Sequence, residues 1–270
     1  MRGVVLSGWS PETRPTTGQI VNHYLTTIYD RPLIDYAILN LRKSGIKDIL
    51  IIIGDSGAGD LVDHVRSGKR YGVRIQYAYQ DSRTGIAGAL SLARGFTGSY
   101  KFCTLLGESV FQHDLSRAAR AFLSCGKDAL TVVRSTRHHE PTEHRVAYYK
   151  KSYSYSPTFE PDSFSLTPST AELREQTRGQ GQVRIFTGAC FYTPAIYDLL
   201  SQYDLGVNPS ACEIMPIHEE LRENNQMRCF KASGWWHHVR DARDVFRLTN
   251  SIHKQGYTYD DPRGHSDARL

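Results

Sequence analysis

The sequence predicts an α/β fold built on a mixed, mostly parallel sheet. Short β-rich runs alternate with amphipathic segments between residues 3 and 107, which is the rhythm of βαβ units with right-handed crossovers. The run 49–53 is continuously apolar, as expected for a strand that is covered on both faces. The strands predicted in this part of the chain are residues 4–6, 48–54, 73–79 and 101–106.

Two segments in this region and a third just beyond it carry apolar residues at positions i, i+3, i+4 and i+7, which predicts helices with one buried stripe. Gly45 follows the first stripe and is expected to end that helix, whereas Asp114 precedes the third and is expected to cap it. The stripes are Ile34, Ala37, Ile38 and Leu41; Ile86, Ala89, Leu90 and Ala93; and Leu115, Ala118, Ala119 and Phe122.

Beyond residue 128 the rhythm changes, and a polar stretch at residues 152–180 interrupts it as a long insertion. We expect one domain over residues 1–256, followed by a polar tail at residues 257–270. The strands predicted here are residues 129–133, 146–149, 183–192 and 227–236, and the helices are residues 194–203, 213–224 and 241–255.

Composition excludes several classes of function. The net charge of +5 comes from basic residues scattered among acidic ones, so we expect no nucleic-acid partner. The five cysteines are widely spaced and include no C-x-x-C pair, so we expect neither a disulfide framework nor a cysteine zinc site. This cysteine usage is typical of a protein in the reducing cytoplasm. No export signal or membrane span is predicted, because the apolar runs are too short.

Ligands of parallel α/β sheets bind beyond the carboxyl ends of the strands, so the residues that follow each strand are the candidates for chemistry. The first strand leads into a loop with Gly8, small hydroxyls and Arg14, a combination that suits phosphate oxygens. The adjacent histidines 237 and 238 point to opposite sides of a strand, so at most one of them enters a site. Trp235 and Trp236 are expected in the core. The other candidate segments are residues 80–85 and 107–108.

Several segments resemble the sugar-1-phosphate nucleotidylyltransferases, most closely the glucose-1-phosphate thymidylyltransferases. The segments occur in the family's order and at roughly its spacing. They are L-S-G-W-S-P-E-T-R at residues 6–14, I-Y-D-R-P-L-I at 28–34, S-G-I-K-D-I-L-I-I at 44–52, the run from 80 to 87, L-G-E-S-V-F at 106–111 and F-T-G-A-C-F-Y at 186–192.

The resemblance implies the nucleotide-diphospho-sugar transferase (GT-A-like) fold and a cytoplasmic enzyme. Its reaction transfers a nucleoside monophosphate from a nucleoside triphosphate to a sugar 1-phosphate or a related polyol phosphate, and it releases pyrophosphate. The family's cofactor is Mg²⁺, with Mn²⁺ or another transition metal as the alternative here. We also expect a homo-oligomer of unspecified size.

Matching the family's motifs to this chain assigns the site residues. Arg14 and His23 take the catalytic positions that hold the triphosphate, and Glu108 and His238 take the two metal positions. The remaining assignments are Leu6, Gly8, Gln80 and Gly85 for the nucleotide, and Arg145, Glu160 and Thr187 for the sugar phosphate.

Three of the catalytic and metal positions depart from the family, and Arg145 stands where the family has glycine. His23 stands where the family has Lys, and its imidazole is mostly neutral at pH 7. Glu108 and His238 stand where the family has Asp, and imidazole suits Zn²⁺, Mn²⁺ or Fe²⁺ better than Mg²⁺. Two alternatives to nucleotidyl transfer therefore stay open: an enzyme in which His23, Glu108 and His238 form a transition-metal triad, and a non-catalytic homologue that binds a nucleotide.

Overall fold

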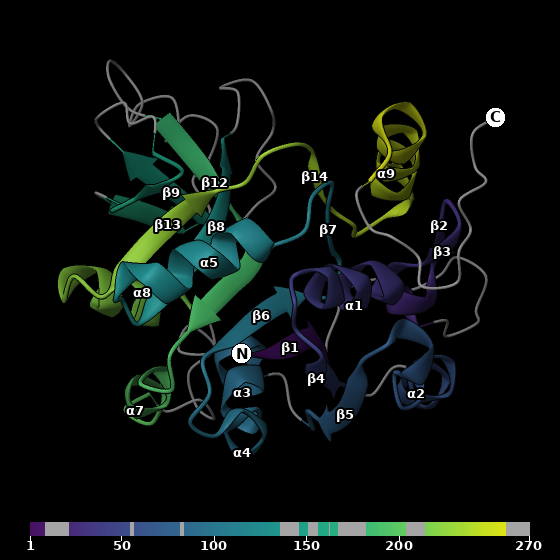
Figure 1. The fold of residues 1–270 in the computed structure, drawn as a ribbon, viewed down its shortest axis with the longest axis horizontal. Helices are drawn as coiled ribbons and strands as arrows, with labels where there is room; N and C mark the ends of the chain where they lie inside the picture. Colours follow the sequence, from purple (N-terminus) through teal and green to yellow (C-terminus); the bar gives the residue numbers. More distant parts are fainter. Residues whose placement is uncertain are drawn as a thin grey trace.

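The computed structural model describes most of the chain and shows a twisted central sheet with helices on both faces (Figure 1). The described residues are 1–8, 22–54, 57–81, 84–135, 146–150, 156–161, 163–166, 182–203 and 214–257.

The main sheet has ten strands, and its principal path runs β10-β13-β8-β12-β6-β1-β4-β5. Six strands of this path run in one direction: β1, β4, β5, β6, β8 and β13. Strand β12 lies between β6 and β8 and runs antiparallel to both. The strands of the path are β10 (Thr158–Phe159), β13 (Met227–Lys231), β8 (Ala129–Ser135), β12 (Gln182–Tyr192), β6 (Phe102–Leu106), β1 (Arg2–Ser7), β4 (Asp48–Ile53) and β5 (Arg74–Tyr79).

Three smaller pairings surround this path. A second branch leaves β12 through β9 (Val146–Lys150), which pairs with β11 (Ser163–Leu166). A two-stranded ribbon joins β7 (Ser109–Phe111) to β14 (Trp236–His238), and another joins β2 (Thr27–Ile28) to β3 (Arg31–Pro32).

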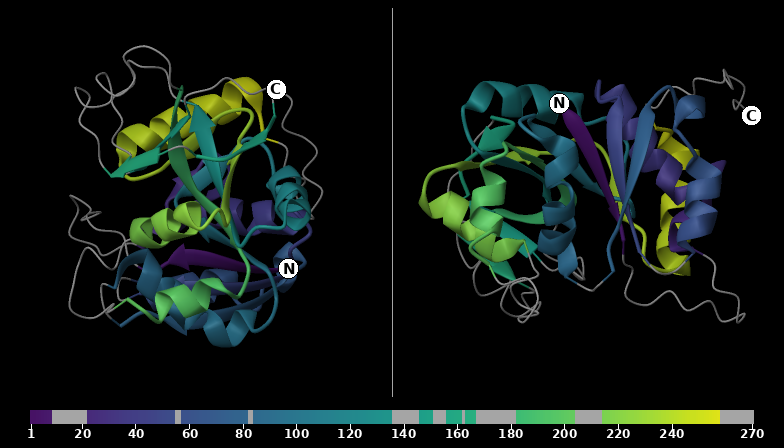
Figure 2. Two further views of the ribbon diagram at one scale, coloured as in Figure 1. Left: turned by 90° about the vertical axis from the view of Figure 1, so that its left-hand side faces the viewer. Right: turned by 90° about the horizontal axis from the view of Figure 1, so that it is seen from below.

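The sheet buries a different apolar cluster on each face, since successive side chains of a strand point in opposite directions. In β1, Val5 joins the cluster packed against α1, α2, α5 and α9, whereas Val4 and Leu6 join the one against α3, α7 and α8. Figure 2 shows these helices on either side of the sheet. The helices are α1 (Leu33–Lys43), α2 (Ala58–Val65), α3 (Gly85–Leu92), α4 (Arg94–Thr97), α5 (Ser116–Cys125), α7 (Ile196–Leu200), α8 (Met215–Glu223) and α9 (Ala242–Gln255), with 3₁₀ turns η1 (His23–Leu25) and η2 (Lys69–Tyr71).

The predicted fold class is confirmed, and the predicted strands and helices of residues 3–107 all occur within a few residues of their expected bounds. The predicted cap of α5 is displaced by one residue: the structure has Leu115 at the cap position, while the Asp114 carboxylate accepts the N–H of Ser116 at 2.8 Å.

The single strand predicted over residues 227–236 is wrong. The chain leaves the main sheet after β13 and turns at Gly234, whose φ of +75° suits glycine, before β14 pairs with β7 in a separate ribbon. The Gln112 side chain accepts the Trp235 N–H at 3.1 Å, and the Gln112 N–H donates to the Trp235 carbonyl at 3.0 Å. These two bonds fix the turn that brings β14 to the carboxyl end of β6.

Parts of the predicted organisation lie outside the described residues. Of the polar insertion at residues 152–180, the structure describes residues 156–161 and 163–166, which include β10 and β11. The predicted tail is described only at Tyr257. Within the described part of the chain, every helix is too short or too polar to cross a membrane.

Two glycines bring the carboxyl ends of β1 and β4 into contact. A Cβ atom added to Gly54 would lie 1.5 Å from the carbonyl oxygen of Gly8, so Gly54 is a position where two backbones meet. A Cβ added to Gly8 would lie 2.5 Å from the Gln80 side-chain oxygen, at the end of β5. The ends of three neighbouring strands are therefore packed more closely than side chains would allow.

We predict that Gly54→Ala lowers the free energy of unfolding by about 2–4 kcal/mol, because the clash is with backbone that cannot rotate away. Gly59→Ala is the matched control: Gly59 lies in α2 with open space around its Cα, and this change is expected to be neutral or to stabilise by up to about 1 kcal/mol. Urea unfolding of the two variants measures the difference, and equal midpoints would contradict the packing argument.

Candidate functional site

Most of the predicted site residues fall into two adjacent groups at the carboxyl ends of the parallel strands. The Gln80 group consists of Leu6, Gly8, Gln80 and Gly85, and the Glu108 group consists of His23, Glu108 and His238. The two groups are connected through Ser7 and Gly107, since a Cβ added to Gly107 would lie 3.3 Å from the Ser7 Cβ. Arg14 and Arg145 lie outside the described residues.

The Gln80 group is fixed by hydrogen bonds of the Gln80 amide. Its nitrogen donates to the Thr84 hydroxyl and to the Gly85 carbonyl, both at 3.1 Å, and the side chain is almost fully buried. Gly85 begins α3 with a φ of +62°, and Leu6 accepts the Gly107 N–H at 2.9 Å. The structure therefore brings together Leu6, Gly8, Gln80 and Gly85, the residues predicted for the nucleotide.

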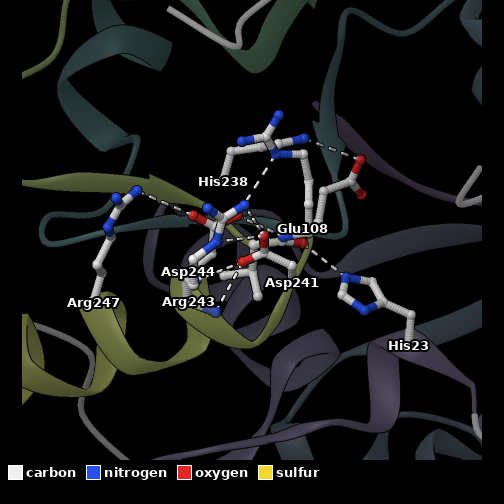
Figure 3. Close-up of polar contacts among 9 residues, drawn as sticks. His23, Glu108, His238, Asp241, Arg243, Asp244 and Arg247 are labelled. Carbon is white, nitrogen blue, oxygen red and sulfur yellow. Dashed lines mark hydrogen bonds and ion pairs between the residues drawn. The ribbon is translucent and has the colours of Figure 1, made fainter. Parts of the chain in front are cut away.

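Glu108 lies between β6 and the β7–β14 ribbon (Figure 3). Its backbone carbonyl accepts the Val239 N–H at 2.9 Å, and its Oε1 lies 3.9 Å from His238 Nε2. Its Oε2 is buried and has no hydrogen-bond partner in the part of the chain that the structure describes. A buried carboxylate oxygen without a donor is costly, so this atom is available to a cation or to a donor on a ligand.

The surroundings of Glu108 change its ionisation. Burial raises the pKa of the Glu108 carboxyl to about 7, and the Tyr24 hydroxyl partly opposes this by hydrogen bonding to the carboxylate. The Tyr24 ring lies against Gly107, where an added Cβ would be 2.9 Å from the ring carbon Cε1. The burial that raises the pKa also leaves the ionised form with little solvation, so a divalent cation would stabilise it strongly.

His23 uses its ring to hold the backbone. Its Nε2 donates to the Val239 carbonyl at 2.7 Å, and burial lowers the pKa of the imidazole, an effect that the Val239 bond and Asp244 partly oppose. His23 is thus a neutral donor to a peptide group, which does not supply the permanent positive charge of the Lys it replaces.

The transition-metal triad of His23, Glu108 and His238 is wrong. His23 and Glu108 each bond to the backbone of Val239, the residue after His238, but no group of three His, Cys, Asp or Glu side chains that could hold a metal occurs among the described residues. The physical reason is that His23 Nε2 is bonded to the Val239 carbonyl and is turned away from a shared ligand position.

The two adjacent histidines of β14 separate as predicted. His238 faces Glu108, whereas His237 Nε2 is 2.8 Å from the Ser251 hydroxyl on α9. Burial, with a smaller contribution from Arg134, lowers the pKa of His237 to about 4. Trp235 and Trp236 are buried in the core, which confirms that prediction.

Of the residues predicted for the sugar phosphate, Glu160 lies away from the site, and Thr187 lies near it with its hydroxyl bonded to the backbone. Glu160 pairs with Arg228 Nη2 at 2.9 Å at the amino ends of β13 and β8, the opposite end of the strands from Glu108. Thr187 is fully buried, and its hydroxyl donates to the Val132 carbonyl at 2.6 Å. Its position in the irregular stretch of β12 ties that strand to β8 instead of presenting the hydroxyl to a ligand.

The residues that the sequence analysis missed are those that position the others. Asn22 accepts the Tyr24 N–H at 2.9 Å and donates to the Gly57 carbonyl at 3.0 Å, which fixes the turn η1. Val239 joins His23 to Glu108 through its two backbone groups. An Asn followed by a short turn is a recognisable capping signal, but no local pattern indicates a backbone partner more than 200 residues away.

The chain belongs to the nucleotidyl transferase family, whose model matches residues 3–255. The nucleotidyltransferase Agl11 of low-salt glycan biosynthesis from Haloferax volcanii is 23% identical over 269 residues, which cover 97% of this chain and 70% of Agl11. A glucose-1-phosphate thymidylyltransferase from Xanthomonas campestris is 34% identical over 120 residues, which cover 44% of this chain and 41% of that enzyme.

Solved structures share the fold. A Bacillus anthracis protein assigned as a glucose-1-phosphate thymidylyltransferase, in complex with sucrose, aligns with a TM-score of 0.76 at 22% identity, covering 94% of this chain and 95% of its own. A UDP-glucose pyrophosphorylase complexed with UDP-glucose aligns with a TM-score of 0.75 at 13% identity, covering 94% and 98%. The matches to the thymidylyltransferases of Neisseria gonorrhoeae and Xanthomonas campestris span only 38% and 41% of those enzymes.

We predict that Glu108→Gln stabilises the fold in a pH-dependent manner. The pKa of Glu108 is raised in the fold from its ordinary 4.5 to about 7. Between pH 4.5 and pH 7 the folded chain therefore binds more protons than the unfolded chain. The free energy of unfolding falls as the pH rises through this window. Glutamine has no such proton, and the variant should gain about 1–3 kcal/mol over the wild type between pH 4.5 and pH 8.

Urea unfolding at both pH values checks this prediction. The control is Glu160→Gln, which removes an exposed ion pair and should shift stability by less than about 1 kcal/mol at either pH. A Glu108→Gln variant whose stability relative to the wild type is the same at pH 4.5 and pH 8 would show that the carboxylate is well solvated.

Proposed function

We propose that this protein transfers a nucleoside monophosphate from a nucleoside triphosphate to a sugar 1-phosphate or a related polyol phosphate and releases pyrophosphate. The observation that carries the proposal is the buried Glu108 carboxylate, whose Oε2 lacks a partner among the described residues, next to the closely packed Gln80 group. Membership of the nucleotidyl transferase family and the shared fold support the same reaction class.

In this reaction a phosphate oxygen of the sugar phosphate attacks the α-phosphorus of the nucleoside triphosphate, and the bond to the β-phosphate oxygen breaks. Pyrophosphate carries away the electron pair of that bond. Positioning and charge stabilisation are the main demands on the protein. In the proposed arrangement Gln80 and Gly85 hold the base, and Arg14 binds the β- and γ-phosphates.

A divalent cation is part of the proposed site, and the residues present fit one. Glu108 supplies a carboxylate oxygen that is buried and without a partner in the described structure, and magnesium-type ions commonly take one or two carboxylates together with substrate phosphates. The bound cation would neutralise phosphate charge. His23, as a neutral donor to Val239, orients the backbone beside Glu108 and adds no charge.

A nucleotide-binding homologue without turnover is the second candidate. The observation that favours it is the hydrogen bond from His23 to Val239, because it removes the phosphate-binding charge expected at that position. The proposed compartment is the cytoplasm, which the free thiols of Cys103, Cys125, Cys190 and Cys229 support, and the proposed assembly is a homo-oligomer.

The experiment measures pyrophosphate release with each nucleoside triphosphate, a panel of sugar 1-phosphates, and Mg²⁺ or Mn²⁺. We expect release with one pairing of nucleotide and sugar, and at least a 100-fold loss of kcat in Glu108→Gln. Glu160→Gln should retain the wild-type rate, since Glu160 lies at the other end of the strands. Nucleotide binding without release would favour the second candidate and reject the first.

We further predict that Arg14→Ala abolishes turnover with an unchanged unfolding midpoint, because the arginine fork matches phosphate oxygens and is assigned here to the ligand and not to the packing of the fold. Pyrophosphate release and thermal unfolding of the same preparation measure both quantities. Wild-type rates in this variant would reject the assignment of Arg14 to the triphosphate.

A further inference from the structure

A second concave surface lies at the carboxyl end of α2, at the β5 edge of the main sheet (Figure 1). It is a pocket of about 630 Å³ lined by residues 63–67, 69 and 70. None of these residues belongs to the Gln80 group or to the Glu108 group. The volume of the pocket falls within the range of about 300–1,000 Å³ that is typical of small-molecule sites.

Three permanently charged cationic side chains line this pocket: Arg66, Lys69 and Arg70. The Arg66 Nε donates to the Asp63 carbonyl at 3.1 Å, which positions the guanidinium. Among the described residues, the terminal nitrogens of Arg66 and the ammonium of Lys69 have no hydrogen-bond or ion-pair partner. Both side chains belong to exposed residues and are therefore available to an anion.

A buried carboxylate beside the pocket holds Arg70 and His64 in place. The Asp35 side chain is only 4% exposed, and its Oδ1 lies 2.8 Å from His64 Nε2 and 3.7 Å from Arg70 Nη2. The same oxygen accepts the Tyr71 hydroxyl at 2.6 Å, and the Arg70 guanidinium lies over the Tyr71 ring, 4.5 Å from its centroid. A side chain that is already fixed loses little conformational freedom when a ligand binds.

The pocket remains positively charged after the nearby carboxylates are counted. Asp35 and Asp63 contribute two negative charges against the three positive charges of Arg66, Lys69 and Arg70. The guanidinium fork matches two oxygens of one phosphate group, and a lysine ammonium binds phosphate as a point charge. The side chains of this pocket therefore suit a phosphorylated anion.

The backbone of Arg66 is strained at this position. Its φ of +54° and ψ of −136° form a conformation that favours glycine, because a Cβ atom is crowded there. Hydrogen bonds hold it in place: the Arg66 N–H donates to the Val62 carbonyl at 2.7 Å, and the Arg66 carbonyl accepts the Tyr77 hydroxyl at 2.6 Å. A glycine would make the same backbone bonds without strain, so the Arg66 side chain itself has a role that the fold does not require.

We propose that this pocket is a second anion site, which binds a small molecule with two or more phosphate groups through Arg66, Lys69 and Arg70. The number of cationic side chains indicates more than one phosphate group, since one tetrahedral group is satisfied by a single arginine fork and one further charge. A ligand in this pocket would bind outside the proposed reaction, and the two assignments are independent.

The experiment locates the anion by chemical protection. Phenylglyoxal modifies accessible guanidinium groups of the full chain, and mass spectrometry of its peptides gives the rate at each arginine. We expect pyrophosphate and tripolyphosphate to slow the modification of Arg66 and Arg70 at least fivefold, and inorganic phosphate to need at least a tenfold higher concentration for the same effect. Arg74 is the internal control, because this exposed arginine pairs with Asp48 outside the pocket and should keep its rate.

Two variants with the same loss of charge test the role of the side chains. Lys69→Ala should raise the pyrophosphate concentration for half-protection of Arg66 at least fivefold, whereas Arg74→Ala should leave it unchanged. Arg66→Gly should raise the midpoint of thermal unfolding, because glycine adopts this backbone conformation without strain. A lower midpoint in Arg66→Gly would show that the arginine serves the fold and would overturn the inference.

The remaining outcomes separate this inference from the proposed function. Unchanged rates at Arg66 and Arg70, equal protection by sodium chloride of the same ionic strength, or equal protection by inorganic phosphate would overturn the inference. Pyrophosphate release from nucleoside triphosphate and sugar phosphate would still leave the proposed function standing. Protection of Arg66 in a protein that releases no pyrophosphate would support the inference and reject that function.

Discussion

The backbone N–H and the backbone carbonyl of Val239 connect segments that lie far apart in the sequence. Its N–H donates to the Glu108 carbonyl, and its carbonyl accepts from His23 Nε2, so the turn η1, the end of β6 and the end of β14 are held at one point. Val239 is fully buried. In a buried place, leaving a polar group without a hydrogen bond costs more free energy than forming the bond contributes to stability. The position of Glu108 relative to His238 therefore depends on a contact of backbone groups, and the fully buried Val239 side chain packs in the core beside it.

The first half of the fold follows from the sequence because its strands are buried on both faces. Residues 49–53 carry no polar side chain, and this run predicts β4 and, with the helix stripes around it, the parallel order of the sheet. The separation of β13 from β14 does not follow, since β-rich residues continue through the turn. What divides the two strands is the pairing of Gln112 with Trp235 and the left-handed conformation at Gly234, both of which depend on tertiary contacts.

The site divides in the same way. Gln80, Gly85 and Glu108 come together because strand ends meet at one edge of a parallel sheet, a rule that needs no knowledge of side chains. The hydrogen bond of His23 depends on a partner 216 residues away. Glu160 was matched to a family motif, yet its strand pairs with β13 in the register that carries it to the amino end, and register is a property of the assembled sheet.

The residues that differ from the family change the electrostatics of the site together. In the motif match, His23 stands where the family has Lys and His238 stands where it has Asp, so the site lacks one fixed positive charge and one fixed negative charge. The side chain that faces Glu108 is therefore an imidazole, whose Nε2 lies 3.9 Å from Glu108 Oε1. A buried carboxylate oxygen without a partner among the described residues is expensive to retain in a fold, and the cation of the proposed function would relieve this cost.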